Sequence, residues 1–233
     1  MKSGINVLIF VGVIAAAMIT SATIANSDVL AEDIEGTDGN DVLSGTNDDD
    51  NIDSGDGNDV NSGERGDDNI DSGDGIGINI GDHREGDGDG GDDVIKSGDG
   101  NDFNFGDNEI GNGDGGDDVI KSGDGNDFNV GDNSEGDGDG GDDKIKSGEG
   151  DDFNFGDSLC CTGAGGDDKI NAGQGDDINN AGDGNDKINA GQGDDLLVGG
   201  DGEDKFKCGS GDDTVIDYNP EEGDKATGNC EDL

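Results

Sequence analysis

Residues 163–216 read GAGGDDKIN, AGQGDDINN, AGDGNDKIN, AGQGDDLLV, GGDGEDKFK and CGSGDDTVI, six consecutive units of nine residues. Each unit has Gly at its fourth position and Asp at its sixth, and all but one have a large apolar residue at the eighth. A short period of this kind is typical of solenoids, in which each unit packs only against its neighbours. The period therefore predicts a stack of short strands and turns.

The nine-residue unit extends back to Gly36, with a longer period in the middle of the chain. Between residues 65 and 164 the sequence repeats every 25 residues, as two units of nine and an insert of seven. The inserts are residues 81–87, 106–112, 131–137 and 156–162. Sixteen of the seventeen units have Asp at the sixth position, and the exception is Gly77. These residues are Asp41, Asp50, Asp59, Asp68, Asp93, Asp102, Asp118, Asp127, Asp143, Asp152, Asp168, Asp177, Asp186, Asp195, Asp204 and Asp213.

The composition excludes a conventional globular core. The chain has 233 residues, 50 glycines, 3% aromatic residues and a formal net charge of -49. Without periodic order or a bound ion, such a chain is expected to be disordered, because ordering the backbone costs roughly 1–2 kcal/mol per residue. The negative field disfavours nucleic acid and anionic lipid as partners and favours cations.

The repeat resembles the RTX (repeats-in-toxin) calcium-binding nonapeptide G-G-x-G-x-D-x-U-x, in which U is large and apolar. Residues 199–207, GGDGEDKFK, match it at every position, and the resemblance covers residues 36–216. It implies an all-β fold, a parallel β-roll in which the six-residue turn binds Ca²⁺ and x-U-x forms a short strand. Replacement of the first glycine by Ser or Ala in several units predicts looser turns.

Calcium chemistry explains the sixth-position aspartates. Ca²⁺ takes six to eight oxygen ligands, more than one turn supplies, so each ion is expected between units n and n+2 on one edge of the roll. We expect all sixteen aspartates to be metal ligands for on the order of a dozen ions, and folding to depend on calcium. An EF-hand starting at Asp137 is excluded because its twelfth position is Gly148. Zinc is not expected, because the chain has one histidine and no C-x-x-C.

The N-terminus predicts export. Lys2 precedes an apolar run over residues 5–19, and small residues follow up to Ala31. We predict a signal peptide over residues 1–31, a short linker over 32–35, the β-roll over 36–216 and a C-terminal cap over 217–233. The protein is then secreted or associated with the cell surface. The alternative is an uncleaved anchor, which would be its contact with a membrane.

The inserts and the cap carry further candidates. Each insert has Asp at its second position, Asp82, Asp107, Asp132 or Asp157, and we expect solvated loops, with Asp132 facing water. An additional calcium site is the alternative. We expect a disulfide between Cys208, which opens the last unit, and Cys230 in the cap. Cys160 and Cys161 then form a vicinal bridge, link two chains or stay reduced.

The eighth position alternates between Ile and Asn through the middle of the chain. Around Asn104 and Asn129 the neighbouring positions are apolar, as in Phe103, Phe105 and Phe128. Since side chains alternate faces along a strand, we expect the Asn strands to be shifted in phase, with Phe in the core and Asn in solvent. The alternative is an internal, hydrogen-bonded Asn ladder with an exposed Phe strip.

No enzymatic activity is expected. The repeats occupy most of the chain, and the lone histidine, His83, is expected to be solvent-exposed in an insert. The sequence therefore predicts a calcium-binding structural or surface-associated protein. The alternative is an adhesion or mineral- and matrix-binding module that uses the acidic rows or the Phe strip.

Overall fold

The computed structural model describes residues 33–85, 88–110, 113–134, 138–157 and 163–231. The predicted signal peptide and the Cys160–Cys161 pair lie outside these ranges. All regular secondary structure in the described residues is strand, arranged as two parallel sheets of ten strands each. The same residues include no helix with the length and hydropathy needed to cross a membrane.

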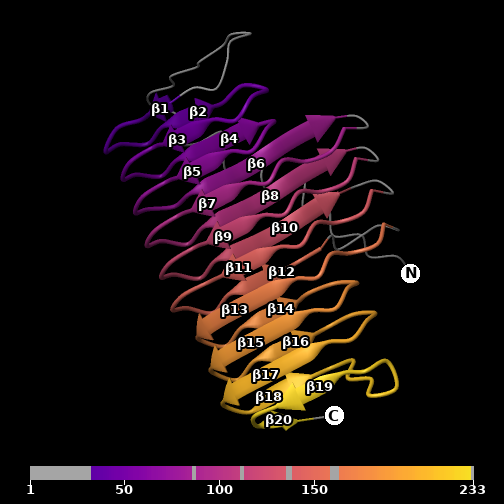
Figure 1. The fold of residues 1–233 in the computed structure, drawn as a ribbon. Helices are drawn as coiled ribbons and strands as arrows, with labels where there is room; N and C mark the ends of the chain where they lie inside the picture. The colour runs from indigo at the N-terminus through magenta and orange to yellow at the C-terminus, as the bar shows by residue number, and fades with distance from the viewer. Residues whose placement is uncertain (1–32, 86–87, 111–112, 135–137, 158–162, 232–233) are drawn as a thin grey trace, which may run out of the picture.

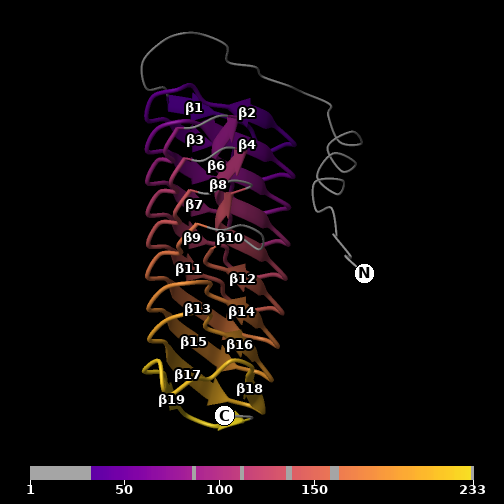
Figure 2. The same ribbon diagram turned by 90° about the vertical axis from the view of Figure 1, so that its right-hand side faces the viewer.

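The chain passes from one sheet to the other with every strand, and the two sheets face each other along the stack (Figures 1 and 2). The first sheet contains β1 (Asp33–Glu35), β3 (Asn51–Asp53), β5 (Asn69–Asp71), β7 (Val94–Lys96), β9 (Val119–Lys121), β11 (Lys144–Lys146), β13 (Lys169–Gln174), β15 (Lys187–Gln192), β17 (Lys205–Ser210) and β19 (Lys225–Thr227). The second sheet contains β2 (Val42–Ser44), β4 (Val60–Glu64), β6 (Ile78–Glu85), β8 (Phe103–Ile110), β10 (Phe128–Ser134), β12 (Phe153–Phe155), β14 (Ile178–Asn180), β16 (Leu196–Val198), β18 (Asp213–Val215) and β20 (Cys230–Glu231). This architecture confirms the predicted parallel β-roll.

The nine-residue unit maps directly onto the coil. In every unit except the last, the strand begins at the seventh position, and the turn that precedes it lies within the first six, as in the unit that ends with β3. The turns need glycine where coils touch. At Gly200, φ is +105°, and an added Cβ would lie 1.6 Å from the carbonyl oxygen of Gly182 in the coil before. Any other residue there would hold the two coils apart.

The ends of the roll continue both sheets. Residues 33–35, expected to be linker, form β1 and pair in register with β3. In the cap, β19 pairs with β17, and β20 pairs with β18. A disulfide joins Cys208 to Cys230 with their Cα atoms 5.4 Å apart. The cap therefore covers the last coil with two further strands and ties them to it covalently.

The interior is apolar on one side and amide on the other. In both sheets the eighth position points inward, so the first sheet contributes a ladder of isoleucines that includes Ile70, Ile95 and Ile120. From β4 to β14 the second sheet contributes a fully buried Asn ladder, in which the Nδ2 of every asparagine except the last, Asn179, donates to the Oδ1 of the next coil. The distances are 2.9 Å for Asn61–Asn79, Asn79–Asn104 and Asn104–Asn129, and 3.0 Å for Asn129–Asn154 and Asn154–Asn179.

The expectation that Asn faces solvent and Phe fills the core is therefore wrong, and the alternative, an internal Asn ladder, is the one observed. The six-residue turn sets the same phase for every strand, so the eighth position lies inside whichever residue occupies it. Stacked amides meet the requirement that buried polar groups be hydrogen-bonded, because each amide has both a donor and an acceptor.

Serine at the first position completes this ladder. Four asparagines also donate to the serine hydroxyl that opens their own unit: Asn61 to Ser54, Asn79 to Ser72, Asn104 to Ser97 and Asn129 to Ser122, each at 3.0 Å. These serines were expected only to loosen their turns. They instead lie inside the roll as acceptors for the amide seven residues later.

The outer faces of the two sheets differ in chemistry. On the second sheet the phenylalanines cluster around Phe128, whose ring centroid lies 5.5 Å from that of Phe155 and 5.9 Å from that of Phe105. Phe153, at the end of this cluster, is 44% exposed. On the first sheet the outward positions include lysines stacked in register, among them Lys96 and Lys121. The Phe strip and the lysines therefore lie on opposite sides of the roll.

The inserts are not solvated loops over their described residues. The first three extend β6, β8 and β10, whose longer arrows in Figure 1 reach past one edge of the stack, whereas Gly156 and Asp157 of the fourth follow the end of β12. Asp82, Asp107 and Asp132 are at most 3% exposed, which corrects the expectation that Asp132 faces water. Parallel pairing continues beyond the ninth position of the unit, and this carries the second residue of each insert under the turn that follows. His83, the next residue, is exposed as expected.

Candidate metal-binding edges

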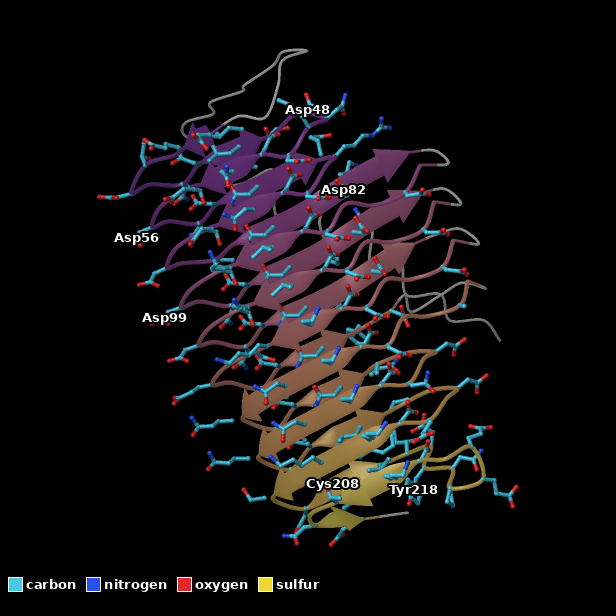
Figure 3. All side chains as sticks on the ribbon, viewed as in Figure 1. Asp48, Asp56, Asp82, Asp99, Cys208 and Tyr218 are labelled. Atoms are coloured by element: carbon cyan, nitrogen blue, oxygen red, sulfur yellow. A yellow bond between two sulfur atoms is a disulfide. The ribbon has the colours of Figure 1, made fainter. Side chains whose placement is uncertain are left out.

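The sixth-position aspartates form two files along the two edges of the roll, and all sixteen are 3% exposed or less. The first edge, where turns lead from the first sheet to the second, holds Asp41, Asp59, Asp102, Asp127, Asp152, Asp177, Asp195 and Asp213. The second edge, where turns lead back, holds Asp50, Asp68, Asp93, Asp118, Asp143, Asp168, Asp186 and Asp204. In Figure 3, Asp56 and Asp99 mark turns of the first edge, and Asp82 lies toward the second.

In fourteen of the sixteen carboxylates, all but Asp41 and Asp50, Oδ1 accepts a backbone N–H of the neighbouring coil. The backbone N–H of Asp168 donates to Oδ1 of Asp186 at 2.8 Å, and that of Asp186 donates to Oδ1 of Asp204 at 3.0 Å. The other oxygen, Oδ2, is buried without a hydrogen-bond donor in fourteen of the sixteen. These are Asp59, Asp68, Asp93, Asp102, Asp118, Asp127, Asp143, Asp152, Asp168, Asp177, Asp186, Asp195, Asp204 and Asp213.

A buried anionic oxygen with no donor points to a cation, because burying an uncompensated charge is costly. The ligands available at each edge are hard oxygens, carboxylates from successive coils and the backbone carbonyls of glycine-rich turns, which are the donors that Ca²⁺ prefers. Glycine makes this approach feasible: a Cβ at Gly202 would lie 1.6 Å from the carbonyl oxygen of Gly184. The residues present therefore fit a calcium ion held between stacked turns.

The electrostatics of the protein alone lead to the same conclusion. Burial, with a contribution from neighbouring carboxylates, raises the pKa of Asp186 to about 8 and that of Asp168 to about 9. On the first edge the same causes raise the pKa of Asp102 to about 7. At neutral pH, two files of adjacent carboxylates are therefore poorly tolerated as anions unless protons or cations compensate them.

The first two turns differ from the rest. Oδ2 of Asp41 accepts hydrogen bonds from the backbone N–H of Thr37 at 2.7 Å and from its hydroxyl at 2.8 Å. Oδ2 of Asp50 accepts from the backbone N–H of Thr46. The signal is visible in the sequence, because only these two units have Thr at the second position. Both were expected to be ligands like the others, but the structure gives their second oxygen a protein donor.

Asp224 in the cap is a further member of the second file that the nine-residue pattern did not predict. Its Oδ1 accepts from the backbone N–H of Asp204 at 3.0 Å, and its Oδ2 accepts from that of Asn219 at 2.7 Å. The six residues from Asn219 to Asp224 end in Gly-Asp, which is the signal that could have found this turn. On the first edge, Gly77 leaves a gap, and its N–H donates to Oδ1 of Asp102 at 2.6 Å.

Comparison with known proteins points to the same chemistry. A family model described as RTX calcium-binding nonapeptide repeat (4 copies) matches residues 30–60, 87–108, 162–178 and 180–215. Comparison with curated proteins and with solved structures found no significant match.

Proposed function

Because the chain belongs to the family of RTX calcium-binding nonapeptide repeat proteins, we propose that it is a secreted, non-enzymatic protein that folds on Ca²⁺ and serves as a structural or surface-associated module. The repeats indicate calcium binding. The observation that carries the proposal is the set of fourteen buried Oδ2 atoms along the two edges. Ions held there, on the order of a dozen, would offset the repulsion within each file and so couple binding to folding.

Calcium dependence of the fold tests this proposal. The chain without its predicted signal peptide is expected to be largely unfolded in chelator and to gain β-structure in about 10⁻⁴–10⁻³ M calcium, the range of extracellular sites. Magnesium is expected to substitute poorly, because it demands near-ideal octahedral geometry. Far-UV circular dichroism during titration measures both. An unchanged β-spectrum in excess chelator would contradict metal-coupled folding.

A matched pair of variants assigns the effect to the files. Asp186→Asn keeps an oxygen that can accept from Asp168 N–H and removes the charge and the second oxygen. Asp201→Asn changes an exposed carboxylate in the next turn of the same edge. A charge-assisted ligand contributes about 1.5–3 kcal/mol. Asp186→Asn is therefore expected to lower the calcium affinity of its site about tenfold or more, and Asp201→Asn is expected to leave it unchanged. Equal effects in the same titration would mean that the files are not the ligands.

A second candidate function, an adhesion or mineral- and matrix-binding module, is favoured by the Phe strip on the outer face of the second sheet. Phe153 is 44% exposed and Phe103, Phe128 and Phe155 are half-buried, whereas Phe105 is buried, so part of the strip is accessible to a partner. Exposed apolar surface is typical of interaction sites. Phe128→Ser is expected to leave calcium-induced folding intact, since the ring lies outside the Asn ladder, and to abolish retention on the surface that the native protein binds. Loss of calcium-induced folding in this variant would instead assign the ring a role in stability.

A further inference from the structure

The second edge carries a second file of carboxylates that the regular nine-residue unit does not contain. Asp82 pairs in register with Asp107, and Asp107 pairs with Asp132, so the three insert residues stack from coil to coil. They are 0%, 1% and 3% exposed, respectively. Neither the calcium-binding turns nor the strands of a regular coil require these residues, and their burial calls for a physical explanation.

Each insert carboxylate fits beneath the turn that follows it. Oδ2 of Asp107 accepts from the backbone N–H of Gly116 at 2.6 Å, and Oδ2 of Asp132 accepts from that of Gly141 at 2.6 Å. The glycine before each donor makes the space. An added Cβ at Gly115 would lie 2.1 Å from Oδ1 of Asp132.

In the sequence, the insert aspartates occur together with the glycines that make room for them. Glycine occupies the third position of a unit in the four units that follow an insert, at Gly90, Gly115, Gly140 and Gly165, and in none of the other thirteen. Asp occupies the second position of all four inserts. An aspartate and the glycine that accommodates it therefore occur together, as expected if the buried carboxylate has a role.

The two files meet in groups of three. Asp107, Asp118 and Asp132, two insert residues and one sixth-position residue, each offer an oxygen within 4.8 Å of the others. Asp68, Asp82 and Asp93 form a second group of three within the same distance, with two sixth-position residues and one insert residue. Asp107 and Asp118 are 1% exposed, and each retains one buried oxygen, Oδ1 and Oδ2 respectively, that has no hydrogen-bond donor. These two oxygens are independent evidence for a ligand, because a solvated acidic cluster would not bury them.

The charge at these groups exceeds that of a regular turn. Here three buried carboxylates lie within 4.8 Å of one another, whereas a regular turn contributes only one file, with one sixth-position carboxylate from each coil. Calcium affinity rises with the number of charged ligands and with the rigidity of the site. Three buried carboxylates on paired strands provide both.

We propose that the second edge contains a second class of calcium site, formed by Asp68, Asp82 and Asp93 and by Asp107, Asp118 and Asp132, that binds Ca²⁺ more tightly than the regular turns. This inference rests on the proposed calcium-binding function and deepens it. The inserts then serve to place high-affinity sites in the middle of the roll. Calcium would fill this region first and the terminal coils later.

Calorimetric titration of the full chain with calcium chloride tests the proposal. The native protein is expected to show a tight phase and a weaker phase. Asp107→Asn, which preserves an acceptor for Gly116 N–H, is expected to reduce the stoichiometry of the tight phase by about half. The double variant Asp82→Asn/Asp107→Asn is expected to weaken the tight phase at least tenfold and leave the weaker phase in place. Asp114→Asn, an exposed change in the same turn as Asp118, is the control.

The outcomes separate this inference from the proposed function. Calcium binding in one phase, or a tight phase that survives in the double variant, overturns the second class of site and leaves the regular sites standing. No calcium binding by the native chain overturns the proposed function itself. If the double variant lacks β-structure in 10 mM calcium, the single variants Asp82→Asn and Asp107→Asn decide. An undiminished tight phase in both overturns the inference, and a reduced one in each supports it.

Discussion

The calcium-free protein is expected to gain β-structure when the pH is lowered from about 8 to about 4. Burial raises the pKa of Asp93 and Asp168 to about 9 and that of Asp152 to about 7 in the folded chain. The unfolded value is about 3.9. The folded chain therefore binds more protons, and its stability falls as pH rises. The stabilisation is fully present below about pH 4 and is lost progressively as pH rises through 7 to 9.

Protons should thus substitute for calcium as counter-charges on the two files. Far-UV circular dichroism of calcium-stripped protein between pH 8 and pH 4 measures the gain. Asp93→Asn, which carries no charge at any pH, is expected to fold at a higher pH than the native chain. Asp92→Asn, an exposed neighbour, should not shift the midpoint. A calcium-free chain that remains disordered at pH 4 would show that carboxylate repulsion is not what keeps it unfolded.

Asn129→Leu is expected to destabilise the calcium-bound roll severely. Oδ1 of Asn129 accepts from Asn104 at 2.9 Å, and its Nδ2 donates to Asn154 and to Ser122, each at 3.0 Å. Leucine has similar size but leaves these buried partners unsatisfied, at a cost of about 1–3 kcal/mol for each group. Urea unfolding in saturating calcium measures the decrease in the free energy of unfolding.

Asn179→Leu is the matched control at the end of the same ladder. Nδ2 of Asn179 has no hydrogen-bond partner, and the residue facing it in the next coil is Leu197. The change removes this unsatisfied donor, which stabilises the fold, but it also removes the acceptor of Asn154 Nδ2, which destabilises it. The two effects on the free energy of unfolding nearly cancel. We expect a change within about 1 kcal/mol. A loss as large as that of Asn129→Leu would mean that amide burial, rather than hydrogen bonding, sets the stability.

The sequence by itself was enough for the fold class and for the chemistry of the edges. The nine-residue period predicts the coil, and Asp at the sixth position of sixteen units predicts the two files, because ligands at a fixed position of a repeat must stack when the repeat stacks. The resemblance to RTX repeats adds the identity of the ion. Local spacing carries all of this information, which is why it could be derived without coordinates.

Only the tertiary structure decided which side chains face inward and which aspartates meet. The phase of the strands that bear Asn104 and Phe103 depends on the preceding turn, and apolarity alone favoured the wrong choice. Gly115 makes room for Asp132, a residue of the next insert, only because the stack places the two coils against each other. Thr37 likewise caps Asp41 through the path of the backbone. Burial and hydrogen bonding between coils are properties of the stack, and a linear pattern does not contain them.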